Sequence, residues 1–343
     1  MEAQERGDYP AAIRDYRKVL TLRPREVEAR VNLGAALVHA GQIDEGIAEY
    51  KAALPELAVK DPVLLNLGLA YYKKQDFKSA REQFEALHRS QPENLRVAIL
   101  LGYSDLGLGD GAAAVAMLQP LEERNRDNAE FEYVLGSAMI KAGSRADGVS
   151  RIERVAAASH SAEAYRLAGS TLLDMNDFEP ARRDLDQALS IDPKEPGLYT
   201  QVGIARDKMG DLEGAESAFR AALKADPNDF DANLYLGAML YKRRDLDEAR
   251  GYLDRALQIN PKSSMAIYES AMLKSNSGQL DAAVADLEKV VAAEPAWLEP
   301  HVALTSLYYR VHRPEDGAKE RAVVDRLRAE EQAHGPAAVK GPE

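Results

Sequence analysis

Cysteine is absent from this chain of 343 residues. Without thiols the protein has no disulfide, no thiolate ligand for a metal and no cysteine nucleophile. The absence does not assign a compartment, because cysteine-free chains occur in reducing and in oxidising surroundings alike. Thiol redox chemistry and covalent cross-linking are therefore excluded as the basis of function.

Long apolar runs and an excess of positive charge are also missing. No stretch approaches the ~18 to 20 apolar residues of a membrane helix, and the opening MEAQERGDYP lacks the regions of a secretory signal. Lys and Arg number 44 against 56 Asp and Glu, a net charge of -12, with no basic cluster. This balance repels phosphate backbones and anionic lipids. We expect no nucleic-acid partner, no membrane insertion, and a soluble chain that is cytoplasmic as given, or periplasmic or extracellular if an upstream signal peptide has been removed.

Residue patterns typical of catalysis or metal binding are not found. None of the six histidines belongs to an HxxxH or HExxH pattern. The stretch from Gly107 to Gly111 imitates a phosphate-binding loop but follows no predicted strand. The acidic stretch from Asp226 to Asp231 has Phe230 at a ligand position and lacks the glycine of a calcium loop. The sequence predicts a protein that is not an enzyme, with no catalytic residue, no metal and no cofactor.

One repeat recurs through the chain. Segments such as VNLGAAL, LNLGLAY, YVLGSAM and LYLGAML return every 34 residues, with a single interval of 33 after residue 129. A period of this length is typical of folds that stack helical units. We number positions from the start of each repeat, and the repeats start at residues 27, 61, 95, 129, 162, 196, 230, 264 and 298.

Small residues recur at two positions of the repeat. Position 8 is glycine from Gly34 to Gly237, and position 20 is alanine or glycine throughout. Glycine inside a helix costs roughly 0.5 to 1 kcal/mol relative to alanine, so a repeated glycine indicates close helix contact. Position 24, one turn beyond position 20, carries a large residue in nearly every repeat. We expect Ala215 to be buried beneath Phe219, and Glu216 to face solvent.

Each repeat contains the signals for two helices. Between the two apolar blocks stands a residue suited to left-handed backbone, followed by a helix cap. These dipeptides are Gly7-Asp8, Gly109-Asp110, Gly143-Ser144, Asn176-Asp177 and Gly210-Asp211. A proline closes the second block in most repeats and ends the helix there. These prolines are Pro24, Pro92, Pro193, Pro227, Pro261 and Pro295.

This pattern resembles that of the tetratricopeptide repeat family. It has small residues at positions 8 and 20, a large residue at position 24 and a proline at position 32. The resemblance spans about residues 7–330. It implies an all-α fold, a right-handed α-solenoid (superhelix) of antiparallel helix pairs, with one solenoid domain and a continuous array over 27–314. Two features depart from the family pattern. The aromatic residue at position 4 is kept only as Tyr165 and Tyr199, and the repeats at 95 and 129 lack the closing proline, which predicts a different bend.

The two ends of the array are expected to differ. Residues 7–26 match only the second helix of a repeat, a half repeat that would leave part of its packing face uncovered at Ile13, Tyr16 and Val19. Residues 315–332 predict a capping helix that completes the last repeat, and 333–343 a tail. The inward residues of this capping helix are expected to be Ala318, Ala322, Val324 and Leu327. The uncovered start is explained by removal of upstream sequence, which we favour, by a tolerated exposed end, or by docking on another copy.

The resemblance also implies where a partner binds. In this family the first helix of each pair lines the concave face, where extended peptides lie. Here that face would be rich in tyrosine, which is enriched at binding hot spots; the alternative role of these tyrosines is packing between first helices. The expected binding residues are Tyr72, Tyr103, Tyr133, Tyr241, Tyr268 and Tyr309, with Asn32 and Asn66 for the peptide backbone. The carboxylate clamp of the family's co-chaperones is not expected, because Val31, Ala35 and Pro62 occupy its places.

We therefore expect a non-enzymatic scaffold that presents a concave, tyrosine-rich groove to a peptide segment or a partner protein. One alternative is a structural protein that forms a homo-oligomer or head-to-tail polymer, the N-terminal helix of one copy stacking on the C-terminal helix of the next. Another is an accessory domain of an enzyme whose catalytic part lies outside this chain.

Overall fold

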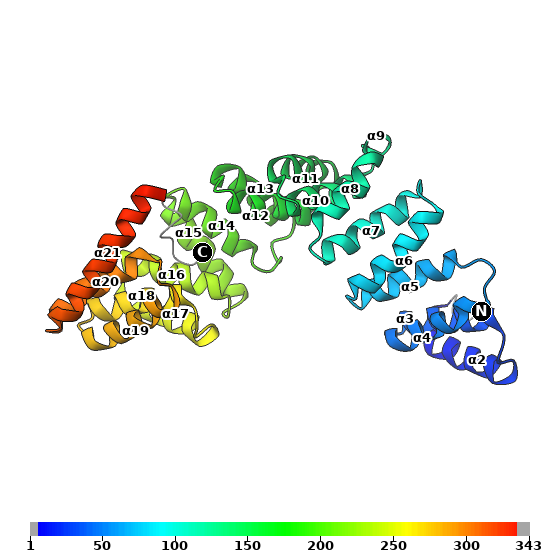
Figure 1. Cartoon of the computed structure of the whole chain (residues 1–343), viewed down its shortest axis with the longest axis horizontal. Helices are drawn as coiled ribbons and strands as arrows, with labels where there is room; N and C mark the ends of the chain where they lie inside the picture. Colours follow the sequence, from blue (N-terminus) through cyan, green and yellow to red (C-terminus); the bar gives the residue numbers. More distant parts are fainter. Residues whose placement is uncertain (1–5, 335–343) are drawn as a thin grey trace. The chain divides into compact units, whose positions relative to one another are not determined.

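The computed structural model describes residues 6–334, and every regular element in that range is a helix. The chain divides into two compact units, with the boundary between Met175 and Asn176. Figure 1 shows helix following helix along each of them. We call them unit 1 and unit 2 and describe each by itself.

Unit 1 is built of antiparallel helix pairs. Its elements are α2 (Tyr9–Leu22), α3 (Val27–His39), α4 (Ile43–Ala53), η1 (Leu54–Glu56), α5 (Asp61–Lys73), α6 (Phe77–Ser90), α7 (Leu95–Gly107), α8 (Gly111–Leu118), η2 (Gln119–Leu121), α9 (Glu122–Asn125), α10 (Ala129–Lys141), α11 (Arg145–Ser159) and α12 (Ala162–Asp174). The first helices α3, α5, α7 and α10 pack on the second helices α4, α6, α8 and α11, and α2 packs on α3. First helices also contact each other, α3 with α5 and α7 with α10.

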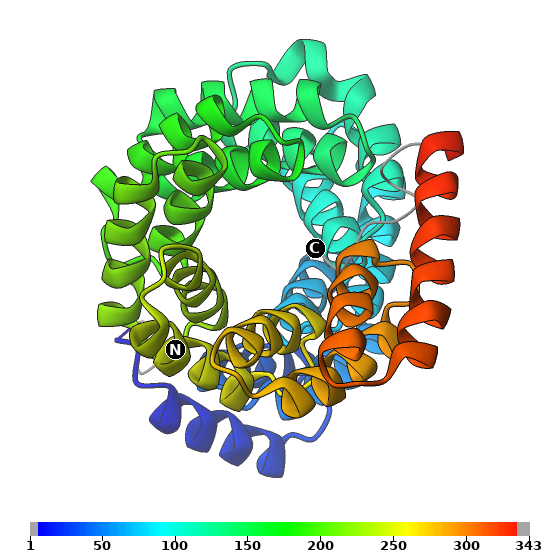
Figure 2. The same cartoon turned by 90° about the vertical axis from the view of Figure 1, so that its left-hand side faces the viewer.

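Unit 2 continues the same arrangement. Its helices are α13 (Phe178–Ile191), α14 (Leu198–Lys208), α15 (Leu212–Ala225), α16 (Phe230–Lys242), α17 (Leu246–Ile259), α18 (Ser264–Asn276), α19 (Leu280–Ala293), α20 (Leu298–Arg310) and α21 (Pro314–His334). The pairs are α14 with α15, α16 with α17, α18 with α19 and α20 with α21. Figure 2 shows the long α21, in red, alongside α20, in orange.

Position 8 is glycine because a side chain from position 24 fills the space of its missing Cβ. A Cβ at Gly68 would lie 2.5 Å from Cε1 of Phe84, and one at Gly237 would lie 2.8 Å from Cγ of Leu253. Both large side chains are fully buried. Burying such a side chain contributes about 1.5 to 3 kcal/mol. The close helix contact predicted from the glycines is confirmed.

Left-handed residues separate the two helices of a repeat, as predicted. Positive φ values are found at Gly7, Gly109, Gly143, Asn176 and Gly210. Asp110 caps α8, its carboxylate accepting a hydrogen bond from the N–H of Ala113 at 3.1 Å. Asp8 and Asp211 cap α2 and α15 in the same way. Ser144 and Asp177 stand at the N-cap positions of α11 and α13 as predicted, but neither side chain makes the expected hydrogen bond.

The prolines end the second helices as predicted. In α2, α6, α13, α15, α17 and α19 the last helical residue stands two residues before the proline. The repeats that start at 95 and 129, which lack the closing proline, end differently. In one, Pro120 lies within the second helix, which breaks into α8, η2 and α9 because proline has no N–H to continue the ladder. In the other, α11 stops at His160, which has a φ of 50°.

The N-terminal helix α2 is better covered than the sequence suggests. Ile13 and Tyr16 are only 6% and 7% exposed. They share one apolar cluster with Leu33 and Leu37 of α3. The expectation that their packing face stays open is wrong, because α3 buries it. Val19 is 36% exposed, as expected of a residue at the uncovered end.

The inward face of α21 differs in part from the expected one. Val324 and Leu327 are buried, but Ala318 and Ala322 are exposed, so their predicted inward orientation is wrong. The buried stripe passes instead through Gly317 and Glu320, seven and four residues before Val324. The tail expected over 333–343 lies, from residue 335 onward, outside the described residues.

A buried polar pair holds α21 on α20. His301 is 5% exposed, and its Nδ1 lies 2.6 Å from Oε2 of Glu320. Its Nε2 faces the carbonyl of Pro295 at 3.3 Å. Arg30 makes the equivalent contacts at the other end of the chain, with Glu49 at 2.8 Å and the carbonyl of Pro24 at 3.1 Å. In these two repeats, which lack the family's aromatic residue at position 4, a polar side chain thus joins the preceding closing proline to the second helix.

Candidate functional site

The predicted tyrosines all lie on first helices, at positions 5, 9 and 12. We call the surface formed by these positions the first-helix face of each unit. All except Tyr309, which is 46% exposed, are half-buried. Unit 1 carries Tyr72, Tyr103 and Tyr133 on α5, α7 and α10, and unit 2 carries Tyr241, Tyr268 and Tyr309 on α16, α18 and α20.

In unit 1 the tyrosines connect neighbouring first helices. The rings of Tyr72 and Tyr103 meet edge to face, with centroids 6.4 Å apart. The hydroxyl of Tyr133 donates to Oε1 of Glu163 on α12 at 3.0 Å. Burial raises the pKa of Tyr103 to about 12 and also raises the pKa of Tyr133. These hydroxyls are therefore protonated at neutral pH and can donate hydrogen bonds.

A cavity of about 690 Å³ opens on the first-helix face of unit 1. Its volume lies within the roughly 300 to 1,000 Å³ of typical small-ligand pockets. The rings of Tyr72 and Phe77 stand edge to face, with centroids 5.3 Å apart. The structure thus brings two of the predicted residues, Asn66 and Tyr72, to one cavity. Apolar walls come from Val38, Leu69, Tyr72 and Phe77, and polar side chains come from His39, Asn66, Lys73 and Gln75.

The polar side chains of the cavity differ in how many of their hydrogen bonds are made within the protein. The Nζ of Lys73 donates to the carbonyl of Val38 at 3.2 Å, which leaves two of its three donors. The half-buried amide of Asn66 has no hydrogen-bond partner among the described residues. Asn32, also half-buried, lies on α3 and does not line the cavity. The side chain of Asn66 therefore has its full hydrogen-bonding capacity open.

In unit 2 the tyrosines are engaged by neighbouring side chains. The hydroxyl of Tyr241 accepts a hydrogen bond from Nδ2 of Asn276 at 2.7 Å. The rings of Tyr268 and Trp297 lie 4.8 Å apart, and burial raises the pKa of Tyr268 to about 12. The ring of Tyr309 packs over Gly317 of α21, where a Cβ would lie 2.9 Å from its Cε2. Tyr309 thus also serves the contact between α20 and α21.

Hydrogen bonds tie three first helices, α5, α18 and α20, to the first helix before each of them. A donor at position 13 reaches position 12 of the preceding repeat in both units. Lys73 reaches the carbonyl of Val38, Asn276 reaches the hydroxyl of Tyr241, and Arg310 reaches Oγ of Ser275. These bonds fix the spacing of the first helices, and with it the spacing of the tyrosines.

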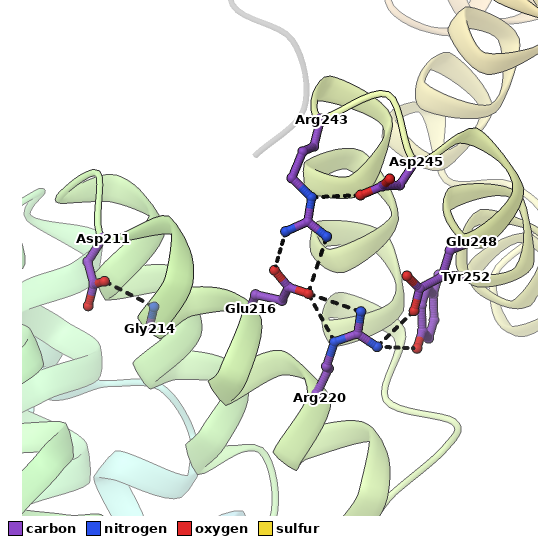
Figure 3. Close-up of polar contacts among 8 residues, drawn as sticks. All are labelled: Asp211, Gly214, Glu216, Arg220, Arg243, Asp245, Glu248 and Tyr252. Atoms are coloured by element: carbon purple, nitrogen blue, oxygen red, sulfur yellow. Dashed lines mark hydrogen bonds and ion pairs between the residues drawn. The ribbon is translucent and has the colours of Figure 1, made fainter.

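The second helices of unit 2 carry an ion-pair network (Figure 3). Glu216 accepts from Arg243 at 2.6 Å and from Arg220 at 3.0 Å, and Arg220 also donates to Glu248 at 2.8 Å. The hydrogen bond from Arg243 lowers the pKa of Glu216. The expectation that Glu216 faces solvent is wrong, since its side chain is 20% exposed and paired. The network joins α15 to α17 through ion pairs among its own side chains, so we assign it a structural role.

Sequence reasoning passed over the buried carboxylates Asp105, Glu132 and Asp184, of which Asp105 is the most buried. Asp105 on α7 is 2% exposed, with Oδ1 3.2 Å from Nε of Arg81 on α6. Burial outweighs the arginine and raises the pKa of Asp105 to about 6. Its place in the apolar block of a first helix was the available signal. Because Asp105 faces the preceding second helix, it belongs to the contact between α6 and α7 and not to the first-helix face.

The described residues offer little for other chemistry. Between residues 6 and 334 no group of three or more His, Asp and Glu is arranged to hold a metal ion. Within the same range, no helix has both the length and the apolar character needed to span a bilayer.

Models of one family match this chain along most of its length. Three models of the tetratricopeptide repeat match residues 1–61 and 203–264, residues 71–138, and residues 162–195 and 266–296. The chain belongs to the tetratricopeptide repeat family. Tetratricopeptide repeat proteins generally mediate protein–protein interactions and are typically non-catalytic. The matched models include no enzyme domain.

A solved tetratricopeptide repeat structure shares the fold. A tetratricopeptide repeat protein from Parabacteroides merdae superposes with a TM-score of 0.52 at 15% identity, over 68% of this chain and 92% of that one. MamA from Desulfovibrio magneticus gives 0.44 at 25% identity, over 49% of this chain and 96% of that one. YrrB, described as a protein with an unusual peptide-binding site, gives 0.43 at 22% identity, over 51% and 91%.

One curated relative also matches. The CTR9 homolog of Arabidopsis thaliana is 27% identical over 106 residues, which is 31% of this chain and 10% of that protein. This chain therefore spans about a tenth of that relative.

Proposed function

We propose that this protein is an interaction scaffold whose first-helix face binds an extended peptide segment or a partner protein. The observation that carries the proposal is the cavity of unit 1, which opens beside Tyr72 and holds the open amide of Asn66. An amide side chain can both donate to a peptide carbonyl and accept from a peptide N–H. An extended segment lying across α3 and α5 would supply both groups.

The tyrosines suit the same role. A half-buried tyrosine has already lost most of its side-chain freedom, so a partner gains contact area at a low entropic cost. Its protonated hydroxyl remains a donor for the partner's backbone. Packing between first helices and binding are compatible here, because the contacts of Tyr103 and Tyr133 hold the rings in place and leave part of each side chain exposed.

Selection of peptides on the intact chain tests the proposal. A random heptapeptide library displayed on phage is panned against the immobilised protein, and the affinity of enriched peptides is measured by fluorescence anisotropy. The variants Tyr133→Ala and Tyr268→Ala remove one tyrosine from each first-helix face. Tyr252→Ala is the matched control, because Tyr252 is half-buried on the second helix α17.

We expect peptides that lose roughly tenfold or more in affinity on removal of a first-helix tyrosine, the size typical of a hot-spot residue. Their affinity for Tyr252→Ala should be that of the parent. The proposal fails if no peptide is enriched, or if enriched peptides bind all three variants as tightly as the parent protein.

A further inference from the structure

We propose that the cavity of unit 1 selects a partner segment in which a large apolar side chain, preferably aromatic, stands next to an acidic residue. This inference rests on the proposed function, since it names the chemistry of the segment that the first-helix face would hold. It depends on two features of the cavity, the shape of its apolar walls and the sign of its charge.

The walls fit a ring. Tyr72 and Phe77 stand edge to face, so a third ring can contact the face of one and the edge of the other. Val38 and Leu69 provide aliphatic surface from α3 and α5. The small side chain of Ala35 leaves the floor open between them. A ring that enters here exchanges water for aromatic and aliphatic contacts and gains the transfer free energy of its buried area.

The charge of the cavity is positive. The ammonium group of Lys73 lines it, and no described lining residue carries a carboxylate. The next lysine, Lys74, is paired with Asp44 at 2.5 Å, so neither adds a free charge. In a chain of net charge -12, this is a local exception. A carboxylate of the partner can take the remaining donors of Lys73, whereas a basic side chain would find no counter-charge.

Asn66 fixes how the segment lies. Its amide stands on α5, two turns before Lys73, with no partner among the described residues. A backbone peptide group bonded to Asn66 sets the segment along the cavity, with its ring between α3 and α5 and its acidic side chain toward Lys73. The ring, the backbone and the carboxylate are thus recognised by different residues.

Three synthetic peptides test the inference on the intact protein. They are the acetylated and amidated tetrapeptides Gly-Phe-Glu-Gly, Gly-Phe-Gln-Gly and Gly-Phe-Lys-Gly, followed by saturation-transfer NMR titration. Ala35→Leu fills the floor of the cavity. Ala238→Leu is its control, because Ala238 is also half-buried, at the same repeat position on α16 of unit 2. Melting of both variants establishes that they are folded.

We expect the glutamate peptide to bind the parent roughly threefold or more tightly than the lysine peptide, as for a partly exposed ion pair, with the glutamine peptide between them. Ala35→Leu should abolish the binding of all three, and Ala238→Leu should leave it unchanged. Lys73→Gln should remove the preference for glutamate, while Lys73→Arg should keep it.

Three results would overturn the inference, and they are separable from failure of the proposed function. Equal or tighter binding of the lysine peptide, lost in Ala35→Leu, rejects acidic selection but leaves a binding surface on the first helices. Glutamate-peptide binding that persists in Ala35→Leu, or no binding of any peptide, rejects the cavity as the recognition site. The proposed function is then decided by the library-selected peptides and the tyrosine variants.

Discussion

Gly148 of α11 crosses Gly136 of α10 so closely that a Cβ on Gly148 would lie 2.6 Å from the carbonyl oxygen of Gly136. The obstacle is backbone, which cannot turn aside as a side chain can. The same crossing occurs between Gly46 and Gly34 in the pair α3 and α4, at 2.8 Å. In these pairs glycine at position 20 therefore sets how near the two helices lie.

Replacing Gly148 by alanine should force the pair α10 and α11 apart. We expect Gly148→Ala to lower the free energy of unfolding by about 1 to 3 kcal/mol, the usual cost of overpacking. Gly251→Ala is the control, because Gly251 lies inside α17 with nothing within 4 Å of its Cβ position. It should raise stability by roughly 0.5 to 1 kcal/mol through helix propensity. Equal shifts in urea denaturation would contradict the packing assignment.

Ala215 tests the same packing at a position where alanine is the small residue. It is fully buried on α15, one turn before Phe219. We expect Ala215→Leu to cost about 1 to 3 kcal/mol of stability. Ala225→Leu, at the exposed end of the same helix, should stay within about 0.5 kcal/mol of the parent. A melting temperature for Ala215→Leu equal to that of Ala225→Leu would rule out the buried position.

The ion pairs of Glu216 should be visible as a salt-dependent stability. Glu216→Gln breaks the pairs with Arg243 and Arg220, and we expect a loss of roughly 0.5 to 1 kcal/mol at low salt that shrinks at high salt. Because pairing lowers the pKa of Glu216, its contribution is present at neutral pH and is lost on acidification through that pKa. Glu213→Gln, exposed on the same helix, should be neutral. A salt-independent loss would argue against ion pairing.

Asp105 should give stability a pH dependence of the opposite sign. Its pKa is raised in the folded state to about 6, so its contribution is complete below the ordinary aspartate pKa and falls as pH rises through about 6. Asp105→Asn removes this titration. Relative to the parent, the variant should gain on the order of 1 to 3 kcal/mol between about pH 4 and about pH 7, measured by urea denaturation. The exposed Asp325→Asn should show no such trend. If the stability of Asp105→Asn relative to the parent stays constant or falls as the pH rises, the assignment is contradicted.

The helix pairs could be predicted because their signals are local and repeated. Glycine at position 8, the large residue at 24 and the closing proline each report one backbone contact or break, and Gly68, Phe84 and Pro92 behave as the period requires. Turns made by other residues escaped the same reasoning. Gln75 and Arg244 adopt φ values of 63° and 71° although neither is glycine or asparagine, because the surrounding pair imposes the turn.

The candidate site could be predicted only in part. The repeat places Asn66 and Tyr72 on a first helix, and this follows from position alone. The cavity depends on Phe77 beginning the next helix against Tyr72 and on the small Ala35 opposite, a combination of side chains from three helices that no period records. The prediction that Ile13 and Tyr16 are partly uncovered fails for a related reason, since the side chains of α3 decide how much of α2 is covered.

Photo-crosslinking tests most directly whether the first-helix face is the binding surface. The tightest library-selected heptapeptide, carrying a benzophenone group in place of one side chain, is irradiated with the intact protein, and the attachment sites are located by mass spectrometry. The account predicts attachment to residues of the first helices, α3 and α5 above all. Attachment confined to second helices such as α4 and α6 would contradict it.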